Sequence, residues 1–240
     1  MEFQDVIRKR KMVRAFTTEP IAPEVGERLL RAANRAPSAG FSQGYAMLVL
    51  ESAEDRSAFW KAMDPEDEYA GTPLRNAQMI VIPCSNKEIY IDRYARPDKG
   101  WTDRDETRWP VPFWHIDTGM LTMLLLLAVV EEGLGALYFG IPPGSNDNVR
   151  AEFGIPADFT PIGAVAIGHP DEDRDARQKT SRKTITRRTV DDIAHRGRWR
   201  AAAATDADAG TAAATAATDA AAVDNVATDA ADAVSATVDL

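Results

Sequence analysis

Two hydrophobic periods alternate along the first 170 residues of the chain, and they predict helices and strands in turn. Segments in which apolar residues recur about every three to four positions are interpreted as helices. Short continuous apolar runs separate them, and their length indicates buried strands. The predicted helices cover residues 3–11, 23–35, 55–63, 119–132 and 146–153, and the predicted strands cover residues 45–50, 77–84, 135–141 and 161–168.

The order of these elements predicts the fold class. Two helices come first, and strands and helices then alternate to residue 168, an order typical of helices packed on a central sheet. Residues 86–114 interrupt it with a long polar insertion rich in aromatic side chains, too long for an ordinary connection. We interpret this insertion as a lid over a binding site; simple packing of its aromatic rings on the body of the protein is the alternative.

The helix at 119–132 contains the longest apolar run of the chain. The run covers residues 119–130, and about 20 residues are needed to cross a bilayer, so we expect a buried helix without a membrane span. Asp117 and Thr118 precede the run and are predicted to cap the start of the helix. A helix that is apolar nearly all round must be covered, and a dimer interface would cover it.

Composition divides the chain into a body and a tail. Of 240 residues, 45% are hydrophobic and 27% charged, as in a soluble globular protein. Residues 201–240 are nearly all Ala, Thr, Asp and Val, hold seven Asp and no basic residue, and are predicted to be a disordered acidic tail. Without those seven charges the net charge falls from −9 to −2, so residues 1–200 form a nearly neutral domain without a general nucleic-acid surface.

The cysteine, the histidines and the N-terminal residues bear on disulfides, metal sites and cellular location. The single Cys84 lies in an apolar run, where it is expected to be a small core residue, and one cysteine forms no intrachain disulfide. The N-terminal residues are polar and acidic, unlike a secretory signal, so a cytoplasmic location is predicted. His115, His169 and His195 share no metal-ligand spacing, and we expect no metal site. His115, in the aromatic insertion, is a candidate proton donor, although packing or capping is the favoured role.

Two segments have the composition of a ligand site. Arg10, Lys11 and Arg14 lie within five residues, and guanidinium groups suit phosphate oxygens. The loop at 36–43 has small side chains that let backbone amides approach a flat ring, and Gln43 adds a donor and an acceptor. A solvated charge run and an ordinary turn are the alternatives for these segments taken singly.

Five segments in this order resemble the nitroreductase family. The first is Ile7-x-x-Arg10-Lys11-x-Val13-Arg14-x-Phe16, and the second is Ala36-Pro37-Ser38-Ala39-Gly40 with Gln43. The others are the strand at 134–141, the stretch 161–170 that ends in Gly-His-Pro, and the basic stretch 183–193. The resemblance covers about residues 3–199. The chain departs from the family at Met12, where Ser is usual, and at Phe41, where Asn is usual.

The resemblance implies an α+β nitroreductase-like fold with a central mixed sheet, forming a dimer that holds FMN in a groove between subunits. It implies transfer of electrons from NADH or NADPH, through the flavin, to a small acceptor such as a nitroaromatic or a quinone. The flavin carries the chemistry, so no catalytic side chain is assigned. The cofactor-binding residues implied are Arg10, Lys11, Met12, Arg14, Pro37, Ser38, Ala39, Gln43, Tyr138, Phe139, Gly140, Ile141, Arg187 and Arg188.

Two other functions stay open at this point. Met12 and Phe41 both remove polar contacts, which favours a flavin-binding protein without turnover. Alternatively, the protein is a flavoenzyme that catalyses a different reaction, as a flavin-dependent dehydrogenase, a dehalogenase, or an enzyme with a deazaflavin donor does. Glycine-rich nucleotide-binding motifs and the nucleophile motif of α/β-hydrolases are absent from the sequence, which disfavours those classes.

Overall fold

The structure is a computed structural model, and it describes residues 1–178 and 184–199. Its contacts divide the chain into two compact units, Met1–Gln178 and Lys179–Asp239, which are described separately. The acidic tail predicted at 201–240 lies outside the described residues.

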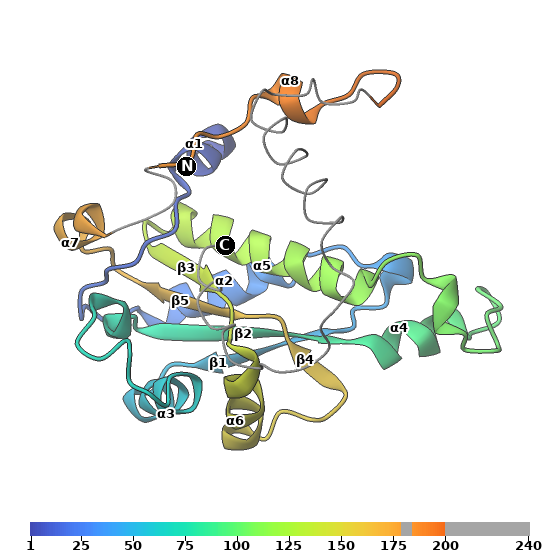
Figure 1. Cartoon of the computed structure of the whole chain (residues 1–240), viewed down its shortest axis with the longest axis horizontal. Coiled ribbons are helices and arrows are strands. Elements are labelled where there is room, and N and C mark those ends of the chain that lie inside the picture. Colours follow the sequence, from blue (N-terminus) through green and yellow to red (C-terminus); the bar gives the residue numbers. More distant parts are fainter. Residues whose placement is uncertain (179–183, 200–240) are drawn as a thin grey trace, which may run out of the picture. The chain divides into compact units, whose positions relative to one another are not determined.

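The first unit contains every helix and strand that the hydrophobic pattern predicts, with shifted boundaries (Figure 1). The helices are α1 (Phe3–Lys9), α2 (Pro23–Ala33), α3 (Ala53–Met63), α4 (Lys87–Tyr94), α5 (Phe113–Glu131), α6 (Pro143–Phe153) and α7 (Glu172–Arg177). The strands are β1 (Tyr45–Leu50), β2 (Met79–Asn86), β3 (Gly135–Phe139), β4 (Phe159–Pro161) and β5 (Ala164–Gly168). The sequence pattern did not predict α4 or α7.

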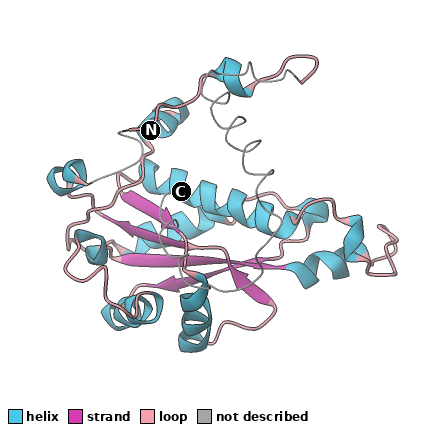
Figure 2. Ribbon diagram, viewed as in Figure 1, coloured by secondary structure: helices cyan, strands magenta, loops and turns pink. Residues whose placement is uncertain are grey.

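The strands form one central sheet in the order β1-β2-β5-β3, and β4 also pairs with β2 (Figure 2). The pairs between these strands are antiparallel. A parallel bridge between Met12 and Ala136 adds a short segment beyond β3 and makes the sheet mixed. The predicted α+β fold with a central mixed sheet is therefore confirmed.

Helices cover both faces of the sheet (Figure 1). Successive side chains of β2 point to opposite faces, and apolar residues on both faces need cover. Met79 and Val81 pack with α2 and α5 on one face. Ile80 and Ile82 point the other way and pack with α3 and α6. Because both faces of β2 are covered, the whole strand is buried, which explains its continuous apolar run.

The prediction for the start of α5 is wrong. The helix begins at Phe113, after Pro112, so Asp117 and Thr118 lie inside it. The hydroxyl of Thr118 donates to the carbonyl of Trp114 at 2.6 Å, one turn back, which satisfies it within the helix. The helix thus begins inside the insertion predicted at 86–114, and the buried Trp114 continues the buried stripe of the helix.

Two predicted strands have different boundaries. The apolar run at 161–168 is divided between β4 and β5 by Ile162 and Gly163, whose φ is 145°. A side chain at Gly163 would collide with the Tyr138 ring and with the carbonyl of Phe139, which explains the glycine. The strand predicted at 135–141 ends at Phe139, because Pro142 and Pro143 soon follow and Pro143 begins α6.

α5 has 19 residues and a mean hydropathy of 1.7, so by length and composition alone it could span a membrane. Its packing confirms the predicted buried helix. It packs on α2 and on the sheet, and Asp117 and Thr122 are buried within it, as in the core helix of a soluble protein. One stripe is uncovered within the described residues: Ile116, Met120 and Met123 are 40%, 43% and 41% exposed.

The insertion at 86–114 contains α4 and a turn at Glu106–Arg108. Its aromatic rings pack on one another around Trp109. Ring centroids of Tyr94 and Trp101 lie 4.5 and 5.4 Å from that of Trp109, and those of Phe113 and Trp114 lie 5.7 and 6.2 Å away. The insertion therefore has a small aromatic core of its own.

The described part of the second unit, residues 184–199, contains α8 (Val190–Ile193). Thr189 and Asp192 form a reciprocal capping box at its start. The guanidinium of Arg188 donates to the carbonyl of Asp192, and the rings of His195 and Trp199 stack at 4.1 Å.

Candidate functional site

The basic segment predicted to bind phosphate runs beside β3. α1 ends at Lys9, and the chain then extends so that the amide of Val13 donates to the carbonyl of Ala136 at 2.8 Å. Gly135 permits this approach, because a Cβ there would lie 2.9 Å from a Val13 methyl carbon. The segment therefore pairs with β3 near the start of that strand, and residues 15–17 then contact residues 169–171, which follow β5.

Met12, at the position where Ser is usual, contacts the same strand. Its Sδ lies 3.5 Å from the backbone nitrogen of Tyr138, which donates to it. A thioether is a weak acceptor and has no proton to donate. Met12 thus accepts a hydrogen bond from the backbone of β3 and provides no side-chain donor for a phosphate.

The three cations of the segment differ in their partners. Lys11 Nζ lies 3.0 Å from Asp175 Oδ2, in α7, and the other oxygen of that carboxylate accepts from the backbone amide of Arg14 at 2.7 Å. Within residues 1–178 and 184–199, the guanidinium groups of Arg10 and Arg14 make no hydrogen bond or ion pair. Two uncompensated positive charges therefore lie in this segment, where an anion would be stabilised.

The end of β3 leaves its backbone open. The ring of Phe139 stacks on Trp60 at 5.8 Å, and the hydroxyl of Tyr138 donates to the carbonyl of Ile162, so both side chains are fixed. The next residue, Gly140, is exposed and has open space where a side chain would be. The backbone at Gly140 and Ile141 is thus accessible to a flat ligand.

Asp117 holds the loop at 37–43 in place. Its Oδ2 accepts from the amide of Ala39 and from the hydroxyl of Tyr90, both at 2.8 Å, and the Asp117 side chain is 3% exposed. Burial and the hydrogen bond to Asp117 raise the pKa of Tyr90. The hydroxyl of Ser38 accepts from the amide of Gln43 at 2.9 Å, which closes the loop. We did not predict this role for Asp117, because it was interpreted as a helix cap.

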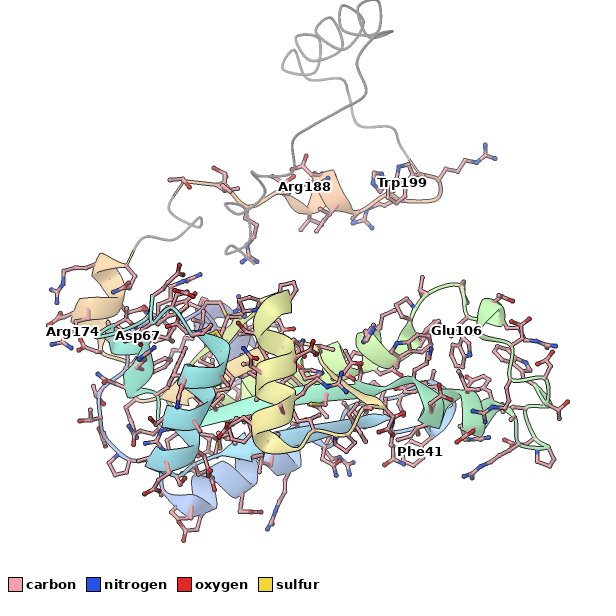
Figure 3. All side chains as sticks on the ribbon, turned by 60° about the horizontal axis from the view of Figure 1, so that its bottom comes forward. Phe41, Asp67, Glu106, Arg174, Arg188 and Trp199 are labelled. Atoms are coloured by element: carbon pink, nitrogen blue, oxygen red, sulfur yellow. The ribbon has the colours of Figure 1, made fainter. Side chains whose placement is uncertain are left out.

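The backbone of the loop is held in the left-handed region at three residues. The φ angles are 60° at Gly40, 55° at Phe41 and 51° at Gln43. At Gly40 a side chain would also collide with the Tyr94 ring, at 2.7 Å. A positive φ is unfavourable for Phe41, because phenylalanine lacks the backbone freedom of glycine. Phe41 is also 73% exposed (Figure 3). An exposed aromatic ring on a strained backbone is a candidate ligand contact.

The structure brings together only some of the predicted site residues. Met12 contacts Ala136 and Tyr138 at the β3 edge of the sheet, whereas Gly140 and Ile141 follow the end of that strand. The loop with Pro37, Ser38, Ala39 and Gln43 precedes β1, at the opposite edge. The bridge at Met12 and the strand order put four strand spacings, about 19 Å, between the basic segment and β1. Arg187 and Arg188 are exposed residues of the second unit.

His115 contacts Ser85 rather than the candidate site residues. Its Nδ1 lies 2.8 Å from the Ser85 hydroxyl, and burial lowers its pKa. That hydrogen bond joins the start of α5 to β2, which is the packing role favoured by the sequence. In the described part of the chain, no three His, Cys, Asp or Glu residues are grouped so as to hold a metal ion.

Known proteins share this architecture. A protein of Archaeoglobus fulgidus named as an NADH dehydrogenase or NAD(P)H nitroreductase is 24% identical over 196 residues, which cover 81% of this chain and 97% of the relative. The structure of the NfrA1 nitroreductase of B. subtilis superposes with a TM-score of 0.65 at 16% identity, covering 89% of this chain and 80% of that one. A nitroreductase of Exiguobacterium sibiricum, crystallised in complex with FMN, superposes with a TM-score of 0.60 at 20% identity, covering 83% and 98%.

The model of the nitroreductase family matches residues 7–169, about two thirds of the chain. The matched range begins just before the basic segment and ends one residue after β5. It includes the loop at 37–43 and the open end of β3. The chain therefore belongs to the nitroreductase family.

Proposed function

We propose that this protein is an FMN-dependent oxidoreductase that passes electrons from NADH or NADPH to a small organic acceptor such as a nitroaromatic or a quinone. The observation that carries the proposal is the pair of uncompensated guanidinium groups, Arg10 and Arg14, in the segment that pairs with β3, the strand whose end leaves the backbone open at Gly140. The names of relatives support it, since one is an NAD(P)H nitroreductase and another was crystallised with FMN.

The residues present fit FMN. Arg10 and Arg14 would hold the terminal phosphate, with Lys11 beside them already paired to Asp175. The backbone at Gly140 and Ile141 would lie along the flat ring. When bound, the flavin supplies the hydride chemistry, so the protein has only to bind, orient and exclude water.

A homodimer would complete the site. One subunit presents its cations and the end of β3 at one edge of the sheet, while its loop at 37–43 lies at the other edge. A second subunit could bring its own loop to the first subunit's cations. The exposed stripe Ile116, Met120 and Met123 on α5 offers an apolar surface for that contact. We propose this arrangement and a cytoplasmic location.

The absorption spectrum of the purified full chain tests the proposal. The protein should carry a yellow flavin that is released as FMN on denaturation, and NADH or NADPH should bleach it without oxygen. A nitroaromatic or a quinone should then restore the colour. A protein that fails to bind FMN on reconstitution would contradict the proposal, and one that binds FMN without bleaching would indicate storage or a different electron donor.

A further inference from the structure

A cavity of about 520 Å³ lies between the loop at 37–43 and α4. Gly40, Phe41, Ser42 and Gln43 form one wall, and Ile89, Asp92, Arg93 and Arg96 form the other. The cavity therefore joins the loop implied in flavin binding to the aromatic insertion. Its volume suits a one-ring or two-ring organic molecule.

Two of the three charged side chains in the cavity wall are neutralised by neighbours. Arg93 donates from Nε to the carbonyl of Gly40 at 2.9 Å, and its other nitrogens contact the carboxylate of Asp98 at 2.9 and 2.7 Å. Asp92 is paired with Arg104. Arg93 thus fixes the loop to α4, and neither group leaves an unpaired charge for a ligand.

Arg96 differs from both, because its guanidinium has no hydrogen bond or ion pair within the described part of the chain. It lies one turn after Arg93, near the end of α4, and its side chain is exposed. The cavity wall therefore has one uncompensated positive charge. Phe41 adds an exposed flat ring held at a φ of 55°, and Gln43 adds a donor and an acceptor.

We propose that this cavity binds the electron acceptor and selects flat aromatic molecules that bear an anionic substituent. The ring of Phe41 would stack on the acceptor's ring, and Arg96 would pair with a carboxylate on it. The proposal rests on the proposed function, since the cavity would lie next to the flavin once the loop at 37–43 is in the dimer site. Phe41 and Arg96 are thereby specificity-determining residues.

The test compares two acceptors that differ in charge, 4-nitrobenzoate and 4-nitrobenzyl alcohol, with the full FMN-loaded protein. The variants are Arg96→Gln, its conservative counterpart Arg96→Lys, and Phe41→Ala. Arg31→Gln is the matched control, because Arg31 is an exposed arginine on α2 that does not line the cavity. Steady-state KM values are measured with saturating electron donor, and the Kd of 4-nitrobenzoate is measured by titration without donor.

Arg96→Gln should raise both the KM and the Kd for 4-nitrobenzoate about ten-fold, the effect of one charge-assisted contact, and leave 4-nitrobenzyl alcohol within about two-fold. Arg96→Lys should recover most of the loss, and Phe41→Ala should weaken both acceptors. Equal effects of Arg96→Gln on the two acceptors, or none, would overturn the proposal. A rise in the KM of Arg96→Gln for NADPH, with no rise for NADH, would also overturn the proposal. That result would indicate that the cavity binds the 2′-phosphate of NADPH.

The FMN content of every variant is measured first, which separates two kinds of failure. If the proposed function is wrong, the unmodified chain itself will fail to bind FMN on reconstitution. The Kd of 4-nitrobenzoate, read from tryptophan fluorescence in the FMN-free chain, then still tests the cavity. Unchanged binding in Arg96→Gln under those conditions would also overturn the proposal.

Discussion

Arg8 and Arg14 carry the same charge but have different surroundings. Arg8, exposed on α1, is paired with Asp5. Arg14 has no partner for its guanidinium in the described residues, although its backbone amide is fixed by Asp175. Spacing alone indicated a cluster of cations at 10–14, but only the fold shows that Lys11 is already paired.

Arg14→Ala should therefore weaken FMN binding more than Arg8→Ala. Loss of a charge-assisted phosphate contact costs about 1.5–3 kcal/mol, or at least about ten-fold in affinity. The measurement is the Kd of FMN from fluorescence quenching at a fixed salt concentration. Equal Kd values for the two variants would remove Arg14 from the phosphate site.

Cys84 should be unreactive in the folded protein. It is 3% exposed, and burial raises the pKa of its thiol to about 11. A thiol reagent such as 5,5′-dithiobis(2-nitrobenzoate) at pH 8 should label the native chain far more slowly than the unfolded chain, because thiolate and access are both lacking. Rapid labelling of the native protein would contradict the burial of β2.

At the scale of elements, the hydrophobic pattern predicts the sheet and the helices on it, because alternation along β2 and the apolar face of α2 are local properties. The predicted start of α5 and the predicted single strand at 161–168 were wrong, because contacts with distant parts of the chain determine where these elements begin and end. Asp117 precedes an apolar run as a cap would, yet its carboxylate contacts Ala39, 78 residues earlier. A sequence separation of that size gives no local signal.

The aromatic insertion gives the clearest prediction for an element. Trp109 contacts Tyr94, Trp101, Phe113 and Trp114, so Trp109→Ala would leave a cavity in their midst. A loss of about 3–5 kcal/mol in the free energy of unfolding is expected. Chemical denaturation measures it, with Phe41→Ala as an exposed aromatic control. A loss below about 1 kcal/mol would show that the rings do not form a core.

α5 should determine the oligomeric state. Met120→Asp puts a charge in the exposed stripe, next to Ile116 and Met123, and should convert the dimer that we propose to a monomer with little bound FMN. Light scattering after size-exclusion chromatography gives the mass. Lys61→Asp, an exposed change on α3, serves as the control. A dimer that persists in Met120→Asp would exclude this stripe as the interface.

For the whole molecule, the sequence predicts the family's segments in order, but the arrangement of those segments in space comes from the sheet. The strand order puts β1, which follows the loop at 37–43, four strand spacings, about 19 Å, from the segment that holds the cations. We therefore propose that Arg14 and Ser38 meet in one site where two copies of the chain supply them. Periodicity and motif spacing within one chain do not contain that information.

A hybrid dimer tests this central claim most directly. One chain carries Arg14→Glu and the other Ser38→Glu, each with a different affinity tag, and the doubly tagged dimer is purified after co-expression. The FMN bound per dimer is then measured. Each variant alone should bind little FMN, whereas the hybrid should bind about one FMN per dimer, because one of its two sites pairs an intact basic segment with an intact loop. A hybrid that binds no more FMN than its parents would contradict a site shared between subunits.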